Sequence, residues 1–231
     1  MRGDAMDEGA FLARVPLFAG LPRSDLAGLA AIMRPRSFKK DEIIFHKGDP
    51  GQVMYFIKEG EVRIFMNTEE EQQVSVAILT AGDFFGELAL LDEKPRSGSA
   101  LAMERTETLT MHRDDFTAQV RQHPQLALGI LAVLAGRLRQ ADELIENLTF
   151  LDIYGRVAKK LLDLAHDYGV DTERGREIRL SLTQRDLASL VGATRESVNR
   201  VLSLYRERGL IIVDRSRITV VKPNELRRRI Y

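Results

Sequence analysis

One helix with two apolar stripes constrains this chain more than any other sequence feature. Over residues 125–147 the first stripe repeats at alternating gaps of four and three residues, and its members are Ala127, Leu131, Leu134, Leu138, Ala141, Ile145 and Leu148. A repeat of about 3.5 residues kept over three heptads is typical of a coiled-coil contact. The second stripe consists of Leu126, Ile130, Val133 and Leu144. We expect the second stripe to pack on this chain and the first on a second copy; a helix buried wholly within its own chain is the alternative.

The segment before this helix has the pattern of short β-strands separated by turns. Short polar segments separate apolar runs at residues 43–45, 54–57, 62–65, 74–79, 99–103 and 108–112; several of these segments contain glycine, and one is the acidic tip at residues 69–71. Many short strands at regular spacing predict a small β-barrel or roll. The sequence therefore predicts a β domain over residues 1–123, the long helix over 124–149 and a helical domain over 150–231.

Charge is distributed unevenly along a chain whose formal net charge is zero. Residues 150–231 hold 17 Lys and Arg against 11 Asp and Glu, a net charge of +6, whereas residues 1–149 hold 17 against 23, a net charge of −6. A basic final third on an acidic body indicates that only this third faces a polyanion. Chance clustering of charge is the alternative.

The most informative stretch, residues 182–202, has the pattern of two helices joined by a tight turn. Thr183 and Asp186 are spaced as a capping box that starts the first helix. Gly192 stands where a tight turn needs a residue tolerant of positive φ, and Thr194 can cap the second helix. In this helix–turn–helix form the second helix can enter the major groove of DNA.

The second helix has an apolar face and an outward face. At about 100° per residue an apolar arc forms on one side, and its members are Val198, Val201, Leu202 and Tyr205. Arginine can donate two hydrogen bonds to guanine, and glutamate can accept one from cytosine. We therefore expect base readout, with DNA contacts from Thr183, Gln184, Thr194, Arg195, Glu196, Ser197, Asn199 and Arg200. A solvated helix face with i,i+4 ion pairs is the alternative.

The rest of the C-terminal domain is expected to complete a winged helix. A first helix is predicted over residues 153–168, with Gly169 as its C-cap and a polar loop over 171–175. The apolar runs 210–213 and 218–221 predict a β-hairpin after the second helix of the motif. At its tip, Arg215 and Arg217 are either phosphate contacts or ordinary turn residues.

A second chemical constellation lies in the β domain, at residues 84–91 followed by Pro95, Arg96 and Ser97. Gly86 lets the backbone approach a ligand, and residues 87–90 can open a short helix whose free N–H groups suit an anion. Arg96 can pair with a phosphate, Ser97 can donate to it, and Glu87 can accept from a ribose hydroxyl. An Arg–Glu pair within a loop is the alternative reading.

Taken in order, these runs resemble the cyclic-AMP receptor protein/FNR (CRP/FNR) family of bacterial regulators over nearly the whole chain. The resemblance is carried by residues 82–88 with Arg96 and Ser97, by the long helix, by 147–158 and by 194–200. It implies an α+β architecture: an N-terminal β jelly-roll cyclic-nucleotide-binding domain, a long dimerisation helix and a C-terminal winged helix-turn-helix. The pattern of Arg195, Glu196 and Arg200 is similar to that of members reading half-sites of the TGTGA type.

The resemblance also implies a set of effector-binding residues. They are Gly86, Glu87, Leu88, Ala89, Arg96, Ser97, Arg137, Ala141 and Asp142. The base end of this set departs from the family, because the cyclic-AMP receptor has adjacent hydroxyl or amide residues where this chain has Ala141 and Asp142. Alanine cannot hydrogen-bond through its side chain, and an ionised aspartate can only accept. In addition, Gly98 follows Ser97 where the receptor has alanine.

We therefore expect a homodimeric regulator that binds palindromic double-stranded DNA under control of a cyclic nucleotide, with cyclic AMP as the favoured effector. RNA polymerase is a further expected partner. The alternatives are an effector-independent family member controlled by its own abundance, and a nucleotide-binding regulatory subunit that acts by protein contact. A gel shift separates that subunit from a DNA-binding regulator.

Other classes of function are disfavoured by what the sequence lacks. The chain has no cysteine, which excludes disulfides, iron–sulfur ligation by thiolates and a cysteine nucleophile. We expect no catalytic residues, no metal site and no obligatory cofactor; the four scattered histidines are not expected to bind haem. No signal peptide or membrane-spanning run is recognisable, so a cytoplasmic location and no membrane partner are expected.

Overall fold

The computed structural model describes residues 8–67, 73–180, 182–214 and 217–230. The chain divides into two compact units, one formed by residues 1–66 with 76–138 and the other by residues 67–75 with 139–231. This division falls within the long helix, whereas the sequence predicts three parts with the helix as a part of its own. That three-part division stays a proposal.

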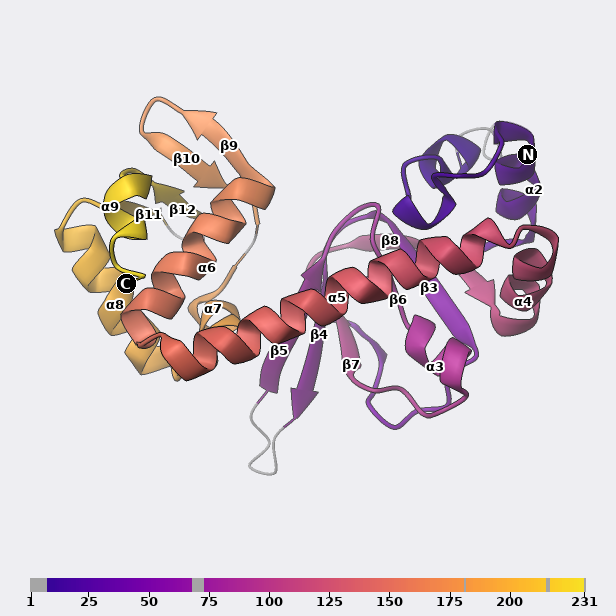
Figure 1. Ribbon diagram of the computed structural model, residues 1–231, viewed down its shortest axis with the longest axis horizontal. Helices are drawn as coiled ribbons and strands as arrows, with labels where there is room; N and C mark the ends of the chain where they lie inside the picture. Colours follow the sequence, from indigo (N-terminus) through magenta and orange to yellow (C-terminus); the bar gives the residue numbers. More distant parts are fainter. Residues whose placement is uncertain (1–7, 68–72, 181, 215–216, 231) are drawn as a thin grey trace. The chain divides into compact units, whose positions relative to one another are not determined.

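The β domain is built from two four-stranded sheets (Figure 1). The first has the order β1-β8-β3-β6, which are Arg34–Phe38, Thr106–His112, Val53–Glu59 and Phe84–Phe85. The second has the order β2-β7-β4-β5, which are Ile43–Phe45, Ser99–Ala102, Val62–Asn67 and Gln73–Leu79. The first sheet pairs antiparallel throughout, with Tyr55 of β3 opposite Thr110 of β8. The predicted β roll is confirmed.

Strand β3 separates two hydrophobic cores because its side chains alternate between the two faces of the sheet. Met54 and Phe56 join a core that also holds residues of the N-terminal helices and of the long helix. Tyr55 and Ile57 point to the opposite face, where they join a core with residues of the second sheet. The domain is therefore layered as helices, sheet and sheet.

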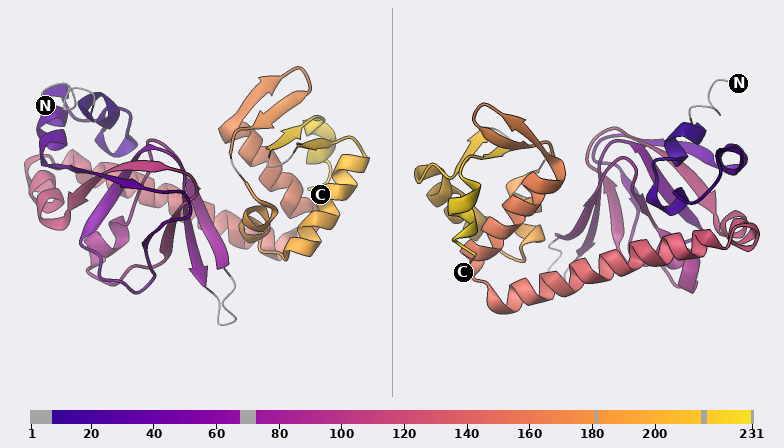
Figure 2. Two further views of the ribbon diagram at one scale, coloured as in Figure 1. Left: turned by 180° about the vertical axis from the view of Figure 1, so that it is seen from behind. Right: turned by 45° about the horizontal axis from the view of Figure 1, so that its top comes forward.

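Helices cover the first core and connect the strands. The elements are η1 (Pro16–Phe18), α2 (Arg23–Ile32), α3 (Glu87–Asp92), α4 (Arg113–Gln122) and the long α5 (Gln125–Phe150). The first half of α5 runs along the β domain (Figure 2). Helix α3 follows β6 directly, which places the predicted effector residues 86–89 at its start.

The two stripes predicted for α5 have different environments in the single chain. Leu126 and Ile130 of the second stripe are buried in the core with η1 and α2, whereas the Leu144 side chain lies outside the described part of the structure. The first stripe is largely open: Leu131, Leu138, Ile145 and Leu148 have exposed fractions of 59%, 64%, 63% and 45%. Leu134 of the first stripe packs against the core, but the described part of the chain leaves Leu131, Leu138 and Ile145 largely uncovered.

The second unit is a small helical domain with a four-stranded sheet. Its helices are α6 (Ile153–Tyr168), α7 (Gln184–Leu190), α8 (Arg195–Glu207) and α9 (Pro223–Arg227), and its sheet has the order β11-β12-β10-β9. Strands β11 (Ile211–Asp214) and β12 (Arg217–Val220) form the predicted wing hairpin.

One local expectation in this unit is wrong. The segment predicted as a polar loop instead forms a hairpin of β9 (Gly169–Thr172) and β10 (Gly175–Ile178), because β10 finds a long-range partner in β12. Gly169 is the C-cap of α6, as predicted, and its backbone is extended, with φ −86°. A Cβ atom there would lie 2.0 Å from the Ala165 carbonyl oxygen, so glycine is needed for space.

Candidate functional site

Capping interactions fix both helices of the helix-turn-helix. The Thr183 hydroxyl accepts from the Asp186 backbone N–H at 3.1 Å, and the Asp186 carboxylate accepts from the Thr183 N–H at 3.0 Å. The Thr194 hydroxyl accepts from the Ser197 N–H at 3.2 Å and starts α8. The structure thus engages the hydroxyl groups of Thr183 and Thr194 in capping, and their predicted DNA contacts remain predictions.

A left-handed glycine makes the turn between the two helices. Gly192 has φ +62°, as the sequence predicts, and a Cβ atom at this position would lie 2.7 Å from Cδ2 of Leu148. Arg156 ties the same turn to the end of α5, since it donates to the carbonyl oxygens of Val191 and Leu151, both at 2.9 Å. The turn is therefore held both by a hydrogen bond to its backbone and by its packing against Leu148.

Helix α8 buries the face that the sequence predicts. Val198, Val201, Leu202 and Tyr205 are at most 4% exposed. Arg195, Glu196 and Arg200 are exposed, so two guanidinium groups and one carboxylate lie on the outer surface of the first half of this helix. The pKa of Glu196 is lowered by its own backbone N–H, by the Thr194 hydroxyl and by Arg195, so this carboxylate stays an acceptor.

Asn199 departs from its expected orientation. The residue is half-buried, and its side-chain Oδ1 is buried without a hydrogen-bond partner in the described part of the chain. The reason is its position on α8 at the edge of the buried arc that contains Val198 and Leu202. Ser197 is also half-buried, so the outward face is narrower than the angles along an ideal helix indicate.

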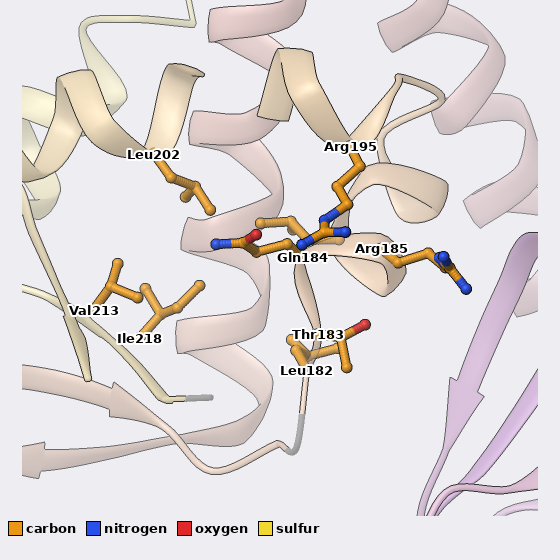
Figure 3. Close-up of a pocket in the computed structure, with 9 residues that line it drawn as sticks. Leu182, Thr183, Gln184, Arg185, Arg195, Leu202, Val213 and Ile218 are labelled. Atoms are coloured by element: carbon orange, nitrogen blue, oxygen red, sulfur yellow. The ribbon is translucent and has the colours of Figure 1, made fainter. Parts of the chain in front are cut away.

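A hollow of about 440 Å³ lies between the helix-turn-helix and the wing (Figure 3). Its walls combine apolar side chains with Gln184, Arg185 and Arg195 from the starts of α7 and α8. Figure 3 labels Gln184 and Arg195 among the side chains that line the hollow. At the wing, Arg217 lies 3.2 Å from the Glu177 carboxylate, which favours its structural role; Arg215 lies outside the described residues.

In the β domain, Gly86 provides space for an arginine. It has φ +80°, and a Cβ atom there would lie 2.5 Å from Nη1 of Arg96 and 3.2 Å from the Val53 carbonyl oxygen. Arg96 is 5% exposed and donates to the carbonyl oxygens of Gly86 and Val53, both at 2.7 Å. Burial lowers the pKa of Arg96. Among the described residues, its Nε finds no hydrogen-bond acceptor.

Glu87 and Arg137 join the start of α3 to α5. The Glu87 side chain is 3% exposed, and its Oε1 accepts from Nη1 of Arg137 at 2.6 Å. Arg137 also donates to the Phe84 carbonyl oxygen. The structure thus brings together four of the predicted effector residues: Gly86, Glu87, Arg96 and Arg137.

The other predicted effector residues are placed less closely. Ala89 is buried, and its carbonyl oxygen accepts from Arg113 at 2.6 Å. Leu88 and Ser97 are exposed. Ala141 and Asp142 are exposed on the part of α5 beyond Leu138, so their role at the base end remains a prediction.

Sequence reasoning missed the residues that surround Arg96. Phe45 and Tyr55 face its guanidinium, with ring centroids 4.3 Å and 5.9 Å from Cζ. Both belong to apolar runs that predict strands, and an aromatic residue in such a run does not indicate that an arginine far along the chain will pack on it. Arg113 was missed for the same reason, because its acceptor Ala89 is 24 residues away.

Within the described residues, the structure contains no helix that is long and apolar enough to cross a membrane. The same residues contain no group of three or more His, Cys, Asp or Glu side chains that could hold a metal ion.

Comparisons with known proteins match both halves of the chain. A cyclic nucleotide-binding domain model matches residues 35–123, and a Crp-like helix-turn-helix domain model matches residues 155–229. The chain is 35% identical to the CRP-like cAMP-activated global transcriptional regulator of Mycobacterium tuberculosis, over 97% of this chain and 99% of that protein.

A curated protein and a solved structure from Thermus thermophilus extend the comparison. The cyclic AMP receptor protein of this organism is 37% identical over 85% of this chain and 88% of its own length. The crystal structure of the catabolite activator protein from the same species is 34% identical, covers 93% of this chain and 98% of its own, and superposes with a TM-score of 0.55. These relatives are regulators of transcription rather than enzymes.

Proposed function

Because this chain belongs to the CRP/FNR family of transcription regulators, we propose that it is a homodimer that binds palindromic DNA under control of cyclic AMP. DNA binding and a cyclic-nucleotide-binding domain are family properties. We propose three further properties: that cyclic AMP is the effector, that DNA binding requires it, and that the protein is a dimer. Two copies would present two α8 helices to half-sites about one DNA turn apart.

The observation that carries the effector proposal is the buried guanidinium of Arg96. A cation that is 5% exposed, with a buried Nε that lacks an acceptor among the described residues, is suited to an anion of complementary shape. A cyclic phosphate offers such acceptors, and Glu87 is the nearby carboxylate for a ribose hydroxyl. Relatives named for cyclic AMP support this effector over other cyclic nucleotides.

The dimer proposal is supported by the exposed seam of α5. Leu131, Leu138 and Ile145 lie at intervals of seven residues, and each is about 60% exposed. Exposed leucines at heptad spacing are covered when two such helices pack together.

Titration and DNA binding together test the proposal. Isothermal titration of the full chain with cyclic AMP should give saturable heat, and a palindrome of two TGTGA half-sites should bind more tightly with the nucleotide than without it. Arg96→Ala should abolish the heat while the protein stays folded by circular dichroism. No heat with the parent protein and no change in operator affinity would remove cyclic AMP from the proposal.

A second candidate is an effector-independent regulator, which Ala141 favours because its methyl group cannot hydrogen-bond a base. This candidate predicts strong operator binding by protein freed of nucleotide, and no further gain when cyclic AMP is added. A nucleotide-binding regulatory subunit is the remaining alternative, and it predicts no salt-dependent binding to any duplex.

The partner and location proposals follow from DNA binding. We propose contact with RNA polymerase, which a pull-down by the operator-bound dimer would test against the unbound dimer. A cytoplasmic location is proposed because the DNA target lies there.

A further inference from the structure

An aromatic ring on β2 lies against the face of the Arg96 guanidinium. Cζ of Arg96 is 4.3 Å from the centroid of the Phe45 ring, close enough for a strong cation–π contact. The Phe45 ring is held in turn by Tyr55 at 5.9 Å and Phe85 at 5.8 Å, and these two rings stack on each other at 4.9 Å. Phe45 is therefore a fixed surface rather than a mobile side chain.

The other sides of the guanidinium are also fixed. Two carbonyl oxygens hold Nη1 and Nη2, and two glycines approach so closely that added Cβ atoms would lie 3.0 Å from Nε at Gly51 and 2.5 Å from Nη1 at Gly86. Burial works against the charged form of Arg96. An aromatic face is the neighbour that offsets this cost without an acceptor that would compete with an incoming anion.

We infer that Phe45 is a positioning residue: its ring orients the Arg96 guanidinium, and the electron density of that ring sets the affinity for a cyclic phosphate. The inference rests on the proposed effector function and adds a residue to it. Phe45 acts on the phosphate end of the site. The same change at Phe45 must therefore weaken cyclic AMP and cyclic GMP by the same factor, although their bases differ.

The decisive experiment keeps the shape of the ring and withdraws its electron density. Phe45 is replaced by 4-fluoro-, 3,5-difluoro- and 3,4,5-trifluorophenylalanine in the full chain, and titration calorimetry measures the dissociation constants of both nucleotides. We expect stepwise weakening that reaches roughly tenfold for the trifluoro ring, with Phe45→Leu similar and Phe45→Trp near the parent. A trifluoro variant that binds as tightly as the parent overturns the inference.

Two matched controls separate the cation–π contact from packing. Phe65 faces a different arginine, with its ring 4.9 Å from Cζ of Arg63, and the same fluorinated series there should leave both dissociation constants within twofold. Phe38 contacts Tyr55 in the same aromatic group, at 6.2 Å, so Phe38→Leu removes a ring without removing the face under Arg96. Weakening by Phe38→Leu equal to that by Phe45→Leu overturns the inference.

An NMR measurement on nucleotide-free protein tests the contact between Phe45 and Arg96 independently of whether cyclic AMP is the effector. The ring current of Phe45 shifts the NMR signal of the Arg96 Nε–H proton, so Phe45→Leu should move that signal in arginine-labelled protein and Phe38→Leu should not. If the parent binds neither nucleotide but the signal moves, the effector proposal fails and the pairing stands. An unmoved signal overturns the pairing itself.

Discussion

Arg137 of α5 is ion-paired with Glu87, the first residue of α3, with 2.6 Å between Nη1 and Oε1. The carboxylate is 3% exposed, whereas the arginine side chain is 32% exposed. The sequence predicts both residues as effector contacts, and the structure shows that one neutralises the other. The pair fixes the start of α3 against the long helix.

Removal of the arginine from this pair should destabilise the fold. Arg137→Ala leaves a buried carboxylate without its cation, and we expect the free energy of unfolding at pH 7 to fall by about 2 kcal/mol in urea titrations. The exposed neighbour Arg139 is the control, and Arg139→Ala should change stability by less than about 0.5 kcal/mol. Addition of Glu87→Gln to Arg137→Ala should recover part of the loss; strict additivity would contradict the pairing.

Gly86→Ala should affect both stability and effector binding. The left-handed backbone costs about 1–2 kcal/mol for any residue with a Cβ atom, and this Cβ atom would also lie 2.5 Å from Nη1 of Arg96. Gly82 is the matched control, since it has φ +97° and nothing within 4 Å of an added Cβ atom. Both variants should lower the thermal midpoint, but only Gly86→Ala should weaken cyclic AMP binding in titration calorimetry. Equal binding by the two variants would contradict the close approach.

Arg200 is exposed on α8 and should contribute to base readout. Arg200→Ala should cost about 1–3 kcal/mol of operator binding and relax specificity at one base pair of each half-site, measured by fluorescence anisotropy with single-base variants of a TGTGA palindrome. Arg206, exposed near the end of the same helix, is the control for loss of charge alone. A uniform loss over all sequences would assign Arg200 to phosphate contact instead.

The exposed seam of α5 should hold two chains together. Leu138→Asp places a charge at a position that is 64% exposed in one chain, so the isolated fold should survive while the dimer dissociates. Sedimentation velocity at micromolar concentration should show a monomer. Ala132→Asp adds the same charge at an exposed position off the seam and should remain dimeric. A dimeric Leu138→Asp protein would place the interface elsewhere.

Asp163 on α6 should make stability depend on pH. Burial raises the pKa of its carboxyl group, against the opposing influence of Lys160. The folded chain thus binds this proton more tightly than the unfolded chain, so the charged form costs stability above the raised pKa, and the cost fades as pH falls towards the ordinary value of 3.8.

Asp163→Asn should therefore unfold at a higher temperature than the parent at pH 7, and this advantage should shrink in acid. Glu207→Gln removes an exposed carboxylate of the same domain and serves as the control. An advantage that is independent of pH would contradict the role of burial.

Local patterns in the sequence predict much of this fold. The seam of α5, the capping box at Thr183, the turn at Gly192 and the buried arc of α8 each depend on residues within a few turns of chain. Such features follow from backbone geometry and side-chain spacing, and both can be read from a short segment of the sequence. The order of these features along the chain was also enough to indicate the family.

The spacing of residue types along the chain does not predict which distant residues come into contact. Glu87 meets Arg137 across 50 residues, and Arg96 meets the Val53 carbonyl across 43, although no periodicity connects them. The sequence by itself determined most of the helices and strands and most of the faces they bury, because those choices are local, whereas the β9–β10 hairpin depended on a distant partner strand. Only the tertiary structure decided that Phe45 lies against Arg96, because the packing of two sheets determines which distant side chains meet.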